Sequence, residues 1–500
     1  MTRAMLIVLD GFGLRDEARG NAIAAAKMPH LKGWMATEPW TKLRASGLDV
    51  GLPRGVMGNS EVGHLALGTG RVVYQALTKI GLSLEDGSFF ENPVLTAAVD
   101  ASKGKALHLI GLVSDGGVHA QIEHPLALLE LAARRGQRRV FVHAILDGRD
   151  MPPRSAAPLL ERIAKQMERL QGGRLSTLGG RFFGMDRDQR WERVRQHFDA
   201  MVRGKALEAP DWRAALDQAY ARGETDEFVQ PTRLLPSRDG LLQPGDLVLL
   251  WNFRPDRMRQ LSRALADPAF GAFPRGAGPW PTTAMTAYDD ALPLPVAFPA
   301  DRATATLGEV VARAGLGQLR IAETEKYAHV TYFFNGGEER TFEGERRILV
   351  PSRRDQSTYD KVPEMSAPAI TDALLAALEE QRFGLVVLNF ANPDMCGHTG
   401  VLDATVKGCE AVDACLGRIV PAARAQGFEV FLTSDHGNAE LMDQGGQPHK
   451  AHTTNPVPLV HLGAGRRALR EGGLSDVAPT ILDAMGLPKP AAMTGRSLFA

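Results

Sequence analysis

Short runs of hydrophobic residues recur along the chain, and each ends in a loop rich in glycine, aspartate or histidine. They include "MLIVLDGFG", "ALHLIGLVSDGG", "RVFVHAILDGRD", "DLVLLWNFRPDR", "GLVVLNFANPD", "EVFLTSDHGN" and "VPLVHLGAG". Segments of helical periodicity lie between them, such as "HPLALLELAARRG" and "VKGCEAVDACLGRIVPAARAQG". Apolar strands that alternate with helices are typical of α/β architecture with largely parallel sheets. Ligands bind beyond the carboxyl ends of such strands, which is where the polar residues fall.

Two segments interrupt this pattern and are predicted domain boundaries. The first is "GTGRVVYQALTKIG" (68–81), which follows a glycine-rich loop, and the second is "YDDALPLPVAFPADRA" (288–303), whose prolines resist regular structure. If both are linkers, residues 76–298 form a domain inserted into another domain that consists of residues 1–75 and 299–500. We therefore expect two α/β domains.

Aspartates and histidines follow several of the predicted strands. Asp435 and His436 are adjacent, "NFANPDMCGHTG" carries Asp394 and His398, "KAHTTNPVP" offers His452, and the first strand ends on Asp10. Three aspartates and three histidines suit Mn²⁺ or Zn²⁺, and six candidates fit two ions better than one. Taken singly, each aspartate could be a helix cap or turn former and each histidine an ordinary surface or core residue. Their joint occurrence favours the metal site, with Cys396 a bystander.

The segment "VMGNSEVGHLALGTG" places Ser60 between glycines and before residues that could start a helix, whose N-terminus would favour an anion. Ser60 could instead be a helix cap, and Glu61 and His64 capping or surface residues. A serine hydrolase is a weaker alternative, because the G-x-S-x-G elbow is not matched and adjacent Asp435 and His436 cannot easily form its base–orienter pair. A divalent ion would activate the hydroxyl by lowering its pKa. Lys326 in "AETEKYAHVT" is the leading cation for an arriving phosphate.

The middle of the chain carries arginines after strands or glycine-rich loops, where their forks can bind carboxylate or phosphate. Arg149 precedes Asp150, a candidate general base. Any one of these arginines could be purely structural, but a small substrate with several negative charges would explain the whole set. The candidates are His119, Arg149, Asp150, Arg181, Arg187, Arg254 and Arg257.

Composition narrows the class of partner. The 500 residues contain 58 Lys+Arg and 58 Asp+Glu, and this zero net charge argues against nucleic acid or an anionic membrane as the main partner. Three cysteines cannot form a disulfide framework, and neither a secretory signal nor a run of about 20 apolar residues is present. We expect a soluble, cytoplasmic protein.

Nine motifs together give a specific resemblance. The chain resembles the 2,3-bisphosphoglycerate-independent phosphoglycerate mutases of the alkaline phosphatase superfamily, from "IVLDGFG" through "TGRSLF". The motifs stand in the family's order: "VMGNSEVGH", "LVSDGGVH", "LDGRD", "MDRDQRWERV", "NFRPDR", "AETEKYAHVTYFFNGG", "NFANPDMCGHTG", "SDHGNAE" and "AHTTNPVP".

The resemblance implies a discontinuous phosphatase-like domain (1–75 and 299–500) that binds metal and carries the nucleophile, and an inserted phosphotransferase domain (76–298), with the active site between them. It implies that Ser60 is the nucleophile, that Asp150 is a proton shuttle, and that Lys326 holds substrate and takes part in catalysis. One ion would bind Asp394, His398 and His452. The other would bind Asp10, Ser60, Asp435 and His436, and the substrate would bind His119, Arg149, Asp150, Arg181, Arg187, Arg254, Arg257 and Lys326.

The implied reaction interconverts 3-phosphoglycerate and 2-phosphoglycerate, in glycolysis and gluconeogenesis, through a phosphoserine intermediate. The implied cofactors are two divalent ions, first of all Mn²⁺, with Zn²⁺ or Co²⁺ as alternatives and no requirement for bisphosphoglycerate. The family also suggests a monomer. The alternatives are a related metal-dependent phosphatase or phosphopentomutase, and a catalytically silent metal- or nucleotide-binding protein. Departures from the family pattern lie at Ala120-Gln121, at Ala66 and in the loop 351–360, and none touches a proposed ligand.

Overall fold

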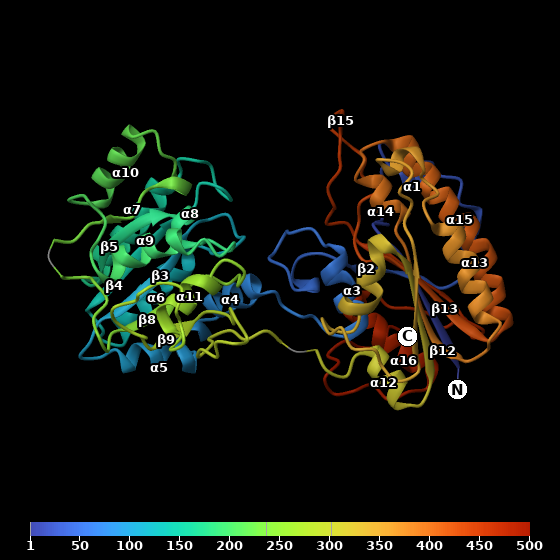
Figure 1. Cartoon of the computed structure of the whole chain (residues 1–500). Coiled ribbons are helices and arrows are strands. Elements are labelled where there is room, and N and C mark those ends of the chain that lie inside the picture. The colour runs from blue at the N-terminus through green and yellow to red at the C-terminus, as the bar shows by residue number, and fades with distance from the viewer. Residues whose placement is uncertain (1, 237, 302) are drawn as a thin grey trace. The chain divides into compact units, whose positions relative to one another are not determined.

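The computed structural model of the chain describes residues 2–236, 238–301 and 303–500. The chain divides into two compact units, each drawn in Figure 1. The outer unit consists of Met1–Gln75 and Asp301–Ala500, and the inserted unit is Ala76–Ala300. The outer unit is therefore assembled from both ends of the sequence, and each unit has a sheet and a hydrophobic core of its own.

The outer unit contains an eight-stranded sheet in the order β11-β10-β12-β1-β13-β16-β2-β17. The pairs β11–β10, β10–β12, β12–β1 and β1–β13 are parallel, whereas β16 runs antiparallel to both β13 and β2. A separate hairpin is formed by β14 and β15. The strands are β1 (Arg3–Leu9), β2 (Trp40–Arg44), β10 (Gly317–Glu323), β11 (Glu345–Val350), β12 (Phe383–Phe390), β13 (Phe428–Thr433), β14 (Asp443–Gln444), β15 (Gln447–Pro448), β16 (Val457–Leu462) and β17 (Gly472–Gly473).

Helices cover both faces of this sheet, which explains why its central strands are apolar at consecutive positions. In β1, Met5, Ile7 and Leu9 pack with α2, α13 and α15, whereas Leu6 and Val8 pack with α3, α12 and α16. The helices are α1 (Ala22–Ala25), α2 (Pro29–Thr37), α3 (Ser60–Thr69), α12 (Leu307–Arg313), α13 (Ala367–Leu378), α14 (Asn392–Gly397), α15 (Leu402–Ala425) and α16 (Val477–Met485). Short helical turns η1 (Gly47–Val50), η4 (Thr324–Lys326), η5 (His329–Phe333), η6 (Tyr359–Lys361) and η7 (Leu474–Asp476) connect them.

The inserted unit contains a seven-stranded sheet in the order β6-β7-β5-β4-β3-β8-β9. Its central strands β5, β4, β3, β8 and β9 are parallel, and β7 is antiparallel to β5. The strands are β3 (Leu107–Val113), β4 (Val140–Leu146), β5 (Arg174–Gly180), β6 (Leu207–Glu208), β7 (Thr232–Arg233), β8 (Leu247–Leu250) and β9 (Thr282–Ala284). The helices are α4 (Ala76–Glu85), α5 (Pro93–Ala101), α6 (Glu123–Arg134), α7 (Ala156–Leu170), α8 (Arg181–Gly184), α9 (Trp191–Val202), α10 (Trp212–Ala221) and α11 (Arg259–Ala266), with turns η2 (Ser88–Glu91) and η3 (Asp226–Phe228).

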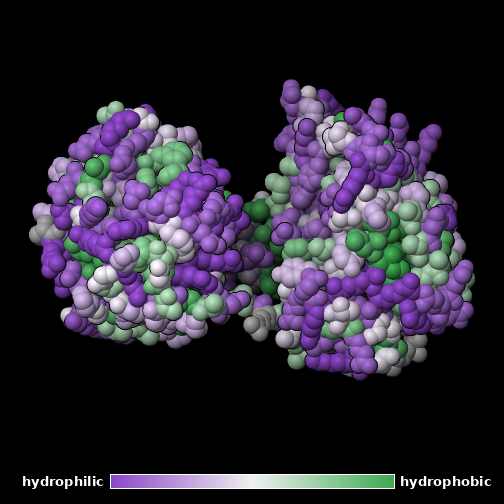
Figure 2. Space-filling view, in the orientation of Figure 1, coloured by the Kyte–Doolittle hydropathy of each residue, from purple (hydrophilic) through white to green (hydrophobic). Residues whose placement is uncertain are grey.

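The predicted α/β class with largely parallel sheets is confirmed in both units. Hydrophilic residues predominate on the visible face of each unit in Figure 2, with hydrophobic residues scattered between them. Among the described residues, no helix has the length and apolar character needed to cross a bilayer.

Candidate metal centre

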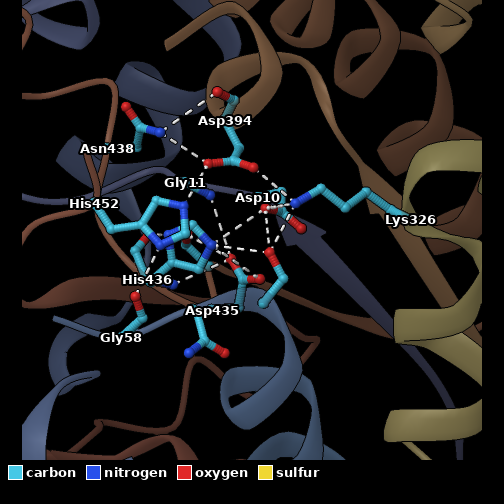
Figure 3. A network of polar contacts seen from close by, with 12 residues as sticks. Asp10, Gly11, Gly58, Lys326, Asp394, Asp435, His436, Asn438 and His452 are labelled. Atoms are coloured by element: carbon cyan, nitrogen blue, oxygen red, sulfur yellow. Dashed lines mark hydrogen bonds and ion pairs between the residues drawn. The ribbon is translucent and has the colours of Figure 1, made fainter. Parts of the chain in front are cut away.

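The side chains predicted to bind metal in the outer unit follow neighbouring strands of its sheet. Asp10 follows β1, Asp435 and His436 follow β13, and Asp394 lies on α14 just after β12. Because β12, β1 and β13 are adjacent and parallel, their carboxyl ends bring these residues to one edge of the sheet. Lys326 arrives from the next strand, β10, and Figure 3 shows these side chains pointing toward one another.

The first cluster consists of Asp394, His398 and His452. The Nε2 atoms of His398 and His452 lie 3.0 Å apart, and each lies 3.2 Å from Asp394 Oδ1. Both rings donate their Nδ1 hydrogen to a backbone carbonyl, His398 to Lys450 and His452 to Gly58. His452 lies in the loop between β15 and β16.

The second cluster surrounds the hydroxyl of Ser60, the first residue of α3. Ser60 Oγ lies 3.1 Å from Asp10 Oδ1, 3.0 Å from His436 Nε2 and 2.7 Å from Lys326 Nζ. Asn59 caps the helix by accepting a hydrogen bond from Val62 N, so Ser60 does not itself serve as the cap. This leaves its hydroxyl facing the carboxylates.

Among the described residues, only one of the two oxygens of the Asp435 carboxylate accepts hydrogen bonds. Its Oδ1 accepts hydrogen bonds from the backbone N–H groups of Gly11 and His436, whereas its buried Oδ2 has no hydrogen-bond partner among the described residues. His436 Nε2 lies 3.6 Å from that Oδ2 and 3.4 Å from Asp10 Oδ1. An unpaired buried carboxylate oxygen is costly unless a cation accompanies it.

Two glycines of the motifs allow this close approach. A Cβ on Gly63 would lie 2.6 Å from the carbonyl oxygen of Asp435, so only glycine lets α3 pack against that strand end. Gly11 has a φ of 71°, and a Cβ there would lie 2.8 Å from Asp394 Cα. The glycines of "LDGFG" and "NSEVGH" thus serve the geometry of the centre.

The donor set fits divalent cations. Because both Nδ1 atoms carry hydrogens, the Nε2 atoms of His398 and His452 face each other and Asp394 Oδ1, and in the neutral rings their lone pairs can bind a cation there. Asp10, Asp394 and Asp435 are buried, and in the described chain Lys326 is the one lysine or arginine that contacts any of them. Three carboxylates against the Lys326 ammonium and the His436 imidazole still leave a deficit of positive charge, which divalent ions would correct.

The charges in the centre shift one another's pKa values. Burial disfavours the charged form of Lys326, but Asp10 and Asp394 outweigh it and raise its pKa above the ordinary range. Burial likewise opposes ionisation of Asp394, yet Lys326, His398 and His452 hold its pKa well below normal. For His436, burial is outweighed by Asp435 and Asp10, and the pKa rises to about 9. The centre therefore favours ionised carboxylates with positive charge beside them.

A cavity of about 470 Å³ opens onto this centre. It is lined by Asn59, Ser60, Glu61, Glu325, Lys326, His329, Asp394, Met395, His398 and His452. The nucleophile candidate, the ammonium and one complete His/Asp cluster thus face a common space. Cys396 is buried and belongs to none of the groups of candidate ligands among the described residues.

In the inserted unit, the predicted substrate-binding residues also lie after the strands of the sheet, and most of them are positively charged. His119, Arg149 and Asp150 follow β3 and β4, Arg181 begins α8 directly after β5, and Arg187, Arg254 and Arg257 lie in loops after α8 and β8. Since β5, β4, β3 and β8 are adjacent and parallel, these loops share one edge of the sheet. Arg254 lies in an irregular loop and Arg257 in a turn, and neither is on a helix.

The Asp150 carboxylate pairs with Arg181 and not with its sequence neighbour Arg149. Its Oδ2 accepts from Arg181 Nη1 at 2.5 Å, while the neighbouring Arg149 lies 3.5 Å from Glu227 Oε1. Arg181 also donates to Asp147 Oδ1 at 2.6 Å, and both side chains of that pair are buried. The cation beside the candidate base is therefore Arg181, supplied by the next strand.

A second carboxylate, Asp256, lies close to three further residues of this cluster. It lies 3.1 Å from Arg187 Nη1, 3.1 Å from Arg254 Nε and 3.6 Å from His119 Nδ1. Burial and the charge of Arg181 lower the pKa of His119 to about 4, so this imidazole is neutral near pH 7. Burial and neighbouring Arg181 and Arg187 also lower the pKa of Arg257, as expected at a locus that favours an anion.

Several residues of these clusters were missed in the sequence. Asn389 lies inside the apolar strand β12, Asn438 donates to Asp394 Oδ1 at 2.9 Å, and His64 is buried rather than on the surface. Asp147 and Asp256 are not among the predicted residues, although they stand in "LDGRD" and "NFRPDR". The position of Asp147 and Asp256 inside recognised motifs could have identified them, whereas no feature of the neighbouring sequence distinguishes Asn389 from an ordinary strand residue.

The comparisons with known proteins agree over the whole chain. A model described as "Metalloenzyme superfamily" matches residues 2–489. The 2,3-bisphosphoglycerate-independent phosphoglycerate mutase of Desulforudis audaxviator is 52% identical, with 100% of this chain and 99% of that protein covered. The enzyme of the same name from Pseudomonas aeruginosa (strain UCBPP-PA14) is 51% identical, with 99% and 98% covered.

A solved structure gives the same result. The phosphoglycerate mutase of Leishmania mexicana, studied at low cobalt concentration, is 32% identical and superposes with a TM-score of 0.60, covering 100% of this chain and 98% of that one. This match confirms the predicted fold class, and the named relatives favour the mutase over the phosphatase or phosphopentomutase alternative. The chain belongs to the metalloenzyme superfamily and, within it, to the family of 2,3-bisphosphoglycerate-independent phosphoglycerate mutases.

Proposed function

We propose that this chain interconverts 3-phosphoglycerate and 2-phosphoglycerate through a phosphorylated Ser60. The observation that supports this most directly is the position of Ser60 Oγ, within 3.1 Å of Asp10, His436 and Lys326 at the head of a helix. A hydroxyl held between cation ligands and an ammonium is arranged to become a nucleophile.

The phosphoryl group moves twice in the proposed reaction. Ser60 Oγ attacks phosphorus, the bond from phosphorus to the substrate oxygen breaks, and the serine proton passes to that departing oxygen, giving phosphoserine and glycerate. The other hydroxyl of glycerate then attacks phosphoserine and returns a proton to Ser60. When bound, two divalent ions would lower the pKa of the serine hydroxyl and neutralise phosphoryl charge. Lys326 donates to Ser60 Oγ and supplies a fixed positive charge beside the transferred group.

The ligand assignment follows the two clusters. Asp394, His398 and His452 would hold one ion, and Asp10, Ser60, Asp435 and His436 the other. Oxygen and imidazole donors without thiolate are consistent with Mn²⁺, with Zn²⁺ or Co²⁺ as alternatives. No bisphosphoglycerate would be required, because the phosphoryl donor is the substrate itself.

The inserted unit would retain glycerate between the two transfers. Arg181, Arg187, Arg254 and Arg257, with His119 and Arg149, offer guanidinium and imidazole groups for the carboxylate and the hydroxyls. Asp150, held by Arg181, would carry the transferred proton. Retained glycerate can react at effective molarities of about 10⁵ M or more, whereas escaped glycerate leaves the enzyme a phosphatase. We further propose that the enzyme is a cytoplasmic monomer of glycolysis and gluconeogenesis.

An enolase-coupled assay tests the proposal. With 3-phosphoglycerate, Mn²⁺ and no added bisphosphoglycerate, the wild type should turn over and a chelator should abolish the rate. Ser60→Ala should be inactive, and acid-quenched wild type should carry phosphate on the Ser60 peptide. Ser497→Ala, a serine paired with Asp483 in the same unit, should retain wild-type activity. Full activity of the Ser60 variant, or of metal-stripped enzyme, would refute the mechanism.

A further inference from the structure

His64 is a buried imidazole one turn into the nucleophile helix α3, and none of the steps above uses it. Its Nδ1 lies 2.9 Å from the backbone carbonyl oxygen of Ser60. A carbonyl only accepts, so Nδ1 carries the hydrogen and donates it. The imidazole is thereby attached to the backbone of the residue whose hydroxyl faces the carboxylates.

The other ring nitrogen of His64 is bound by Asn389, at the end of β12. The Asn389 amide nitrogen lies 3.0 Å from His64 Nε2 and 2.8 Å from Asp10 Oδ2. The orientation of the amide follows, because its oxygen in that place would face the Asp10 carboxylate. Its two hydrogens therefore go to Asp10 and to His64, which leaves His64 as a neutral ring with Nε2 accepting.

His64 also faces the third carboxylate. Asp435 Oδ2, the oxygen without a hydrogen-bond partner, lies 3.1 Å from His64 Nδ1, off the direction in which that N–H points. The hydrogen goes to the Ser60 carbonyl, and Asp435 Oδ2 stays available as a ligand at a fixed distance from the ring. The His64 imidazole thus contacts the Ser60 carbonyl oxygen and Asp435 Oδ2 directly. It is linked to Asp10 through the side-chain amide of Asn389.

We propose that His64 and Asn389 are positioning residues for one of the two ion sites, the site of Asp10, Ser60, Asp435 and His436. This inference rests on the proposed function. In the described residues neither side chain has a hydrogen bond or ion pair with Asp394, His398 or His452. Loss of the pair should therefore weaken one ion and leave the other bound.

The test is Mn²⁺ binding to metal-stripped protein, followed by calorimetry and by metal analysis after gel filtration. Wild type should bind two ions. His64→Leu and Asn389→Leu should weaken one of the two binding steps by about 10–100-fold, the usual effect of removing a group that orients a metal ligand, and change the other by less than about threefold. His64→Asn keeps an amide donor near the Nδ1 position and should recover part of the lost affinity.

His461→Gln is the matched control. His461 is a buried histidine of the same unit that contacts a carboxylate, Glu429, at 2.9 Å, and among the described residues no hydrogen bond or ion pair joins it to either cluster. This variant should bind two ions with wild-type affinities even if its melting temperature falls. A general loss of packing would therefore be seen in the control as well, whereas a positioning role would not.

The outcomes separate the two proposals. Wild type that binds fewer than two Mn²⁺ ions would overturn the proposed two-ion function. Wild type that binds two, with folded His64 and Asn389 variants that bind both unchanged or lose both equally, would overturn this inference alone. If His64→Leu does not fold, the same criterion applies to His64→Asn and Asn389→Leu, each of which removes only part of the network.

Discussion

Lys326 is the residue on which the charge balance of the centre depends most. Its ammonium lies 2.6 Å from Asp10 Oδ1, 2.7 Å from Asp394 Oδ2 and 2.7 Å from Ser60 Oγ. It therefore touches carboxylates assigned to both ions and the proposed nucleophile. A single fixed cation in this place can stabilise charge that develops on the transferred group at no cost of reorganisation.

We expect Lys326→Met to lower kcat by about 100-fold or more, because removal of one preorganised charge partner in a buried site has effects of that size. Steady-state rates at saturating Mn²⁺ and substrate measure it. Lys361→Met, which removes an exposed lysine on η6 of the same unit, should stay within about twofold of wild type. A kcat for Lys326→Met close to that of wild type would contradict the assigned role.

We expect Arg257 to keep glycerate in the site between the two transfers rather than to accelerate the transfer itself. It donates to the Met185 carbonyl at 3.2 Å, and Arg181 and Arg187 nearby make its surroundings strongly positive. Such a locus is suited to the carboxylate of glycerate.

Arg257→Ala should raise the ratio of free phosphate released to phosphoglycerate isomerised by about tenfold, since loss of one charge-assisted hydrogen bond is worth about 1.5 kcal/mol. A phosphate-release assay run beside the coupled assay gives the ratio. Arg263→Ala provides the comparison, because Arg263 pairs with Asp289 and lies outside the cluster. An unchanged ratio in Arg257→Ala would count against retention by this residue.

At the scale of elements, the sheet of the inserted unit contains a buried polar chain. His108 Nδ1 lies 2.9 Å from His143 Nε2, His108 Nε2 lies 3.3 Å from Asp246 Oδ2, and His143 Nδ1 lies 2.9 Å from Thr177 Oγ1. Asp246 can only accept from His108, so the order of donors is fixed along β5, β4, β3 and β8. Burial lowers the pKa of both His108 and His143.

His197 on α9 is a simpler case, because neither of its ring nitrogens has a hydrogen-bond partner among the described residues. Burial lowers its pKa to about 4, from an ordinary value of 6.5. The unfolded chain therefore binds more protons, and stability is lost as the pH falls from about 6.5 towards 4. From pH 7 to pH 5 this residue alone costs about 2 kcal/mol of unfolding free energy.

We expect His197→Leu to flatten this dependence, because leucine fills the site without titrating. Urea unfolding of metal-free protein at pH 7 and pH 5, followed by tryptophan fluorescence, measures it. Four of the six tryptophans (Trp191, Trp212, Trp251 and Trp280) report on the inserted unit. The difference between the two pH values should shrink by about 2 kcal/mol relative to wild type. Equal pH dependence in both proteins would contradict the assignment.

The sequence was sufficient to predict the site residues that lie at the ends of strands. Asp10, Asp394 and Asp435 each stand where an apolar run stops, and parallel sheets bring such ends together. Asn389 could not be found in this way, because it is the second-last residue of an apolar strand and its partners lie 325 and 379 residues away in the sequence. The pairing of Asp150 with Arg181 could not be predicted for the same reason, because the two residues follow different strands.

At the scale of the whole molecule, the two units have separate cores, and all seven proposed metal ligands lie in the outer one. Bound ions stabilise the unit that holds them by mass action, by about 4 kcal/mol at a thousandfold excess over Kd. The inserted unit has no share in those ligands. Metal should therefore affect the two units differently.

Removal of metal with a chelator should lower the melting temperature of the outer unit by several degrees and leave the inserted unit nearly unchanged. Differential scanning calorimetry with and without Mn²⁺ measures both transitions. Asp394→Asn should abolish most of the shift, and Asp372→Asn, an exposed aspartate that pairs with Arg418 in the same unit, should preserve it. Equal shifts of both transitions would contradict the assignment of the ligands to one unit.

The pairing of β1 with β12 and β13 also bears on how the protein is made. Arg3–Leu9 is synthesised long before its partners Phe383–Phe390 and Phe428–Thr433. The inserted unit, Ala76–Ala300, is complete long before them and can fold first. The strand Arg3–Leu9 can complete this pairing only after Thr433 has emerged, and an ion can be captured by the whole ligand set only after His452 has emerged.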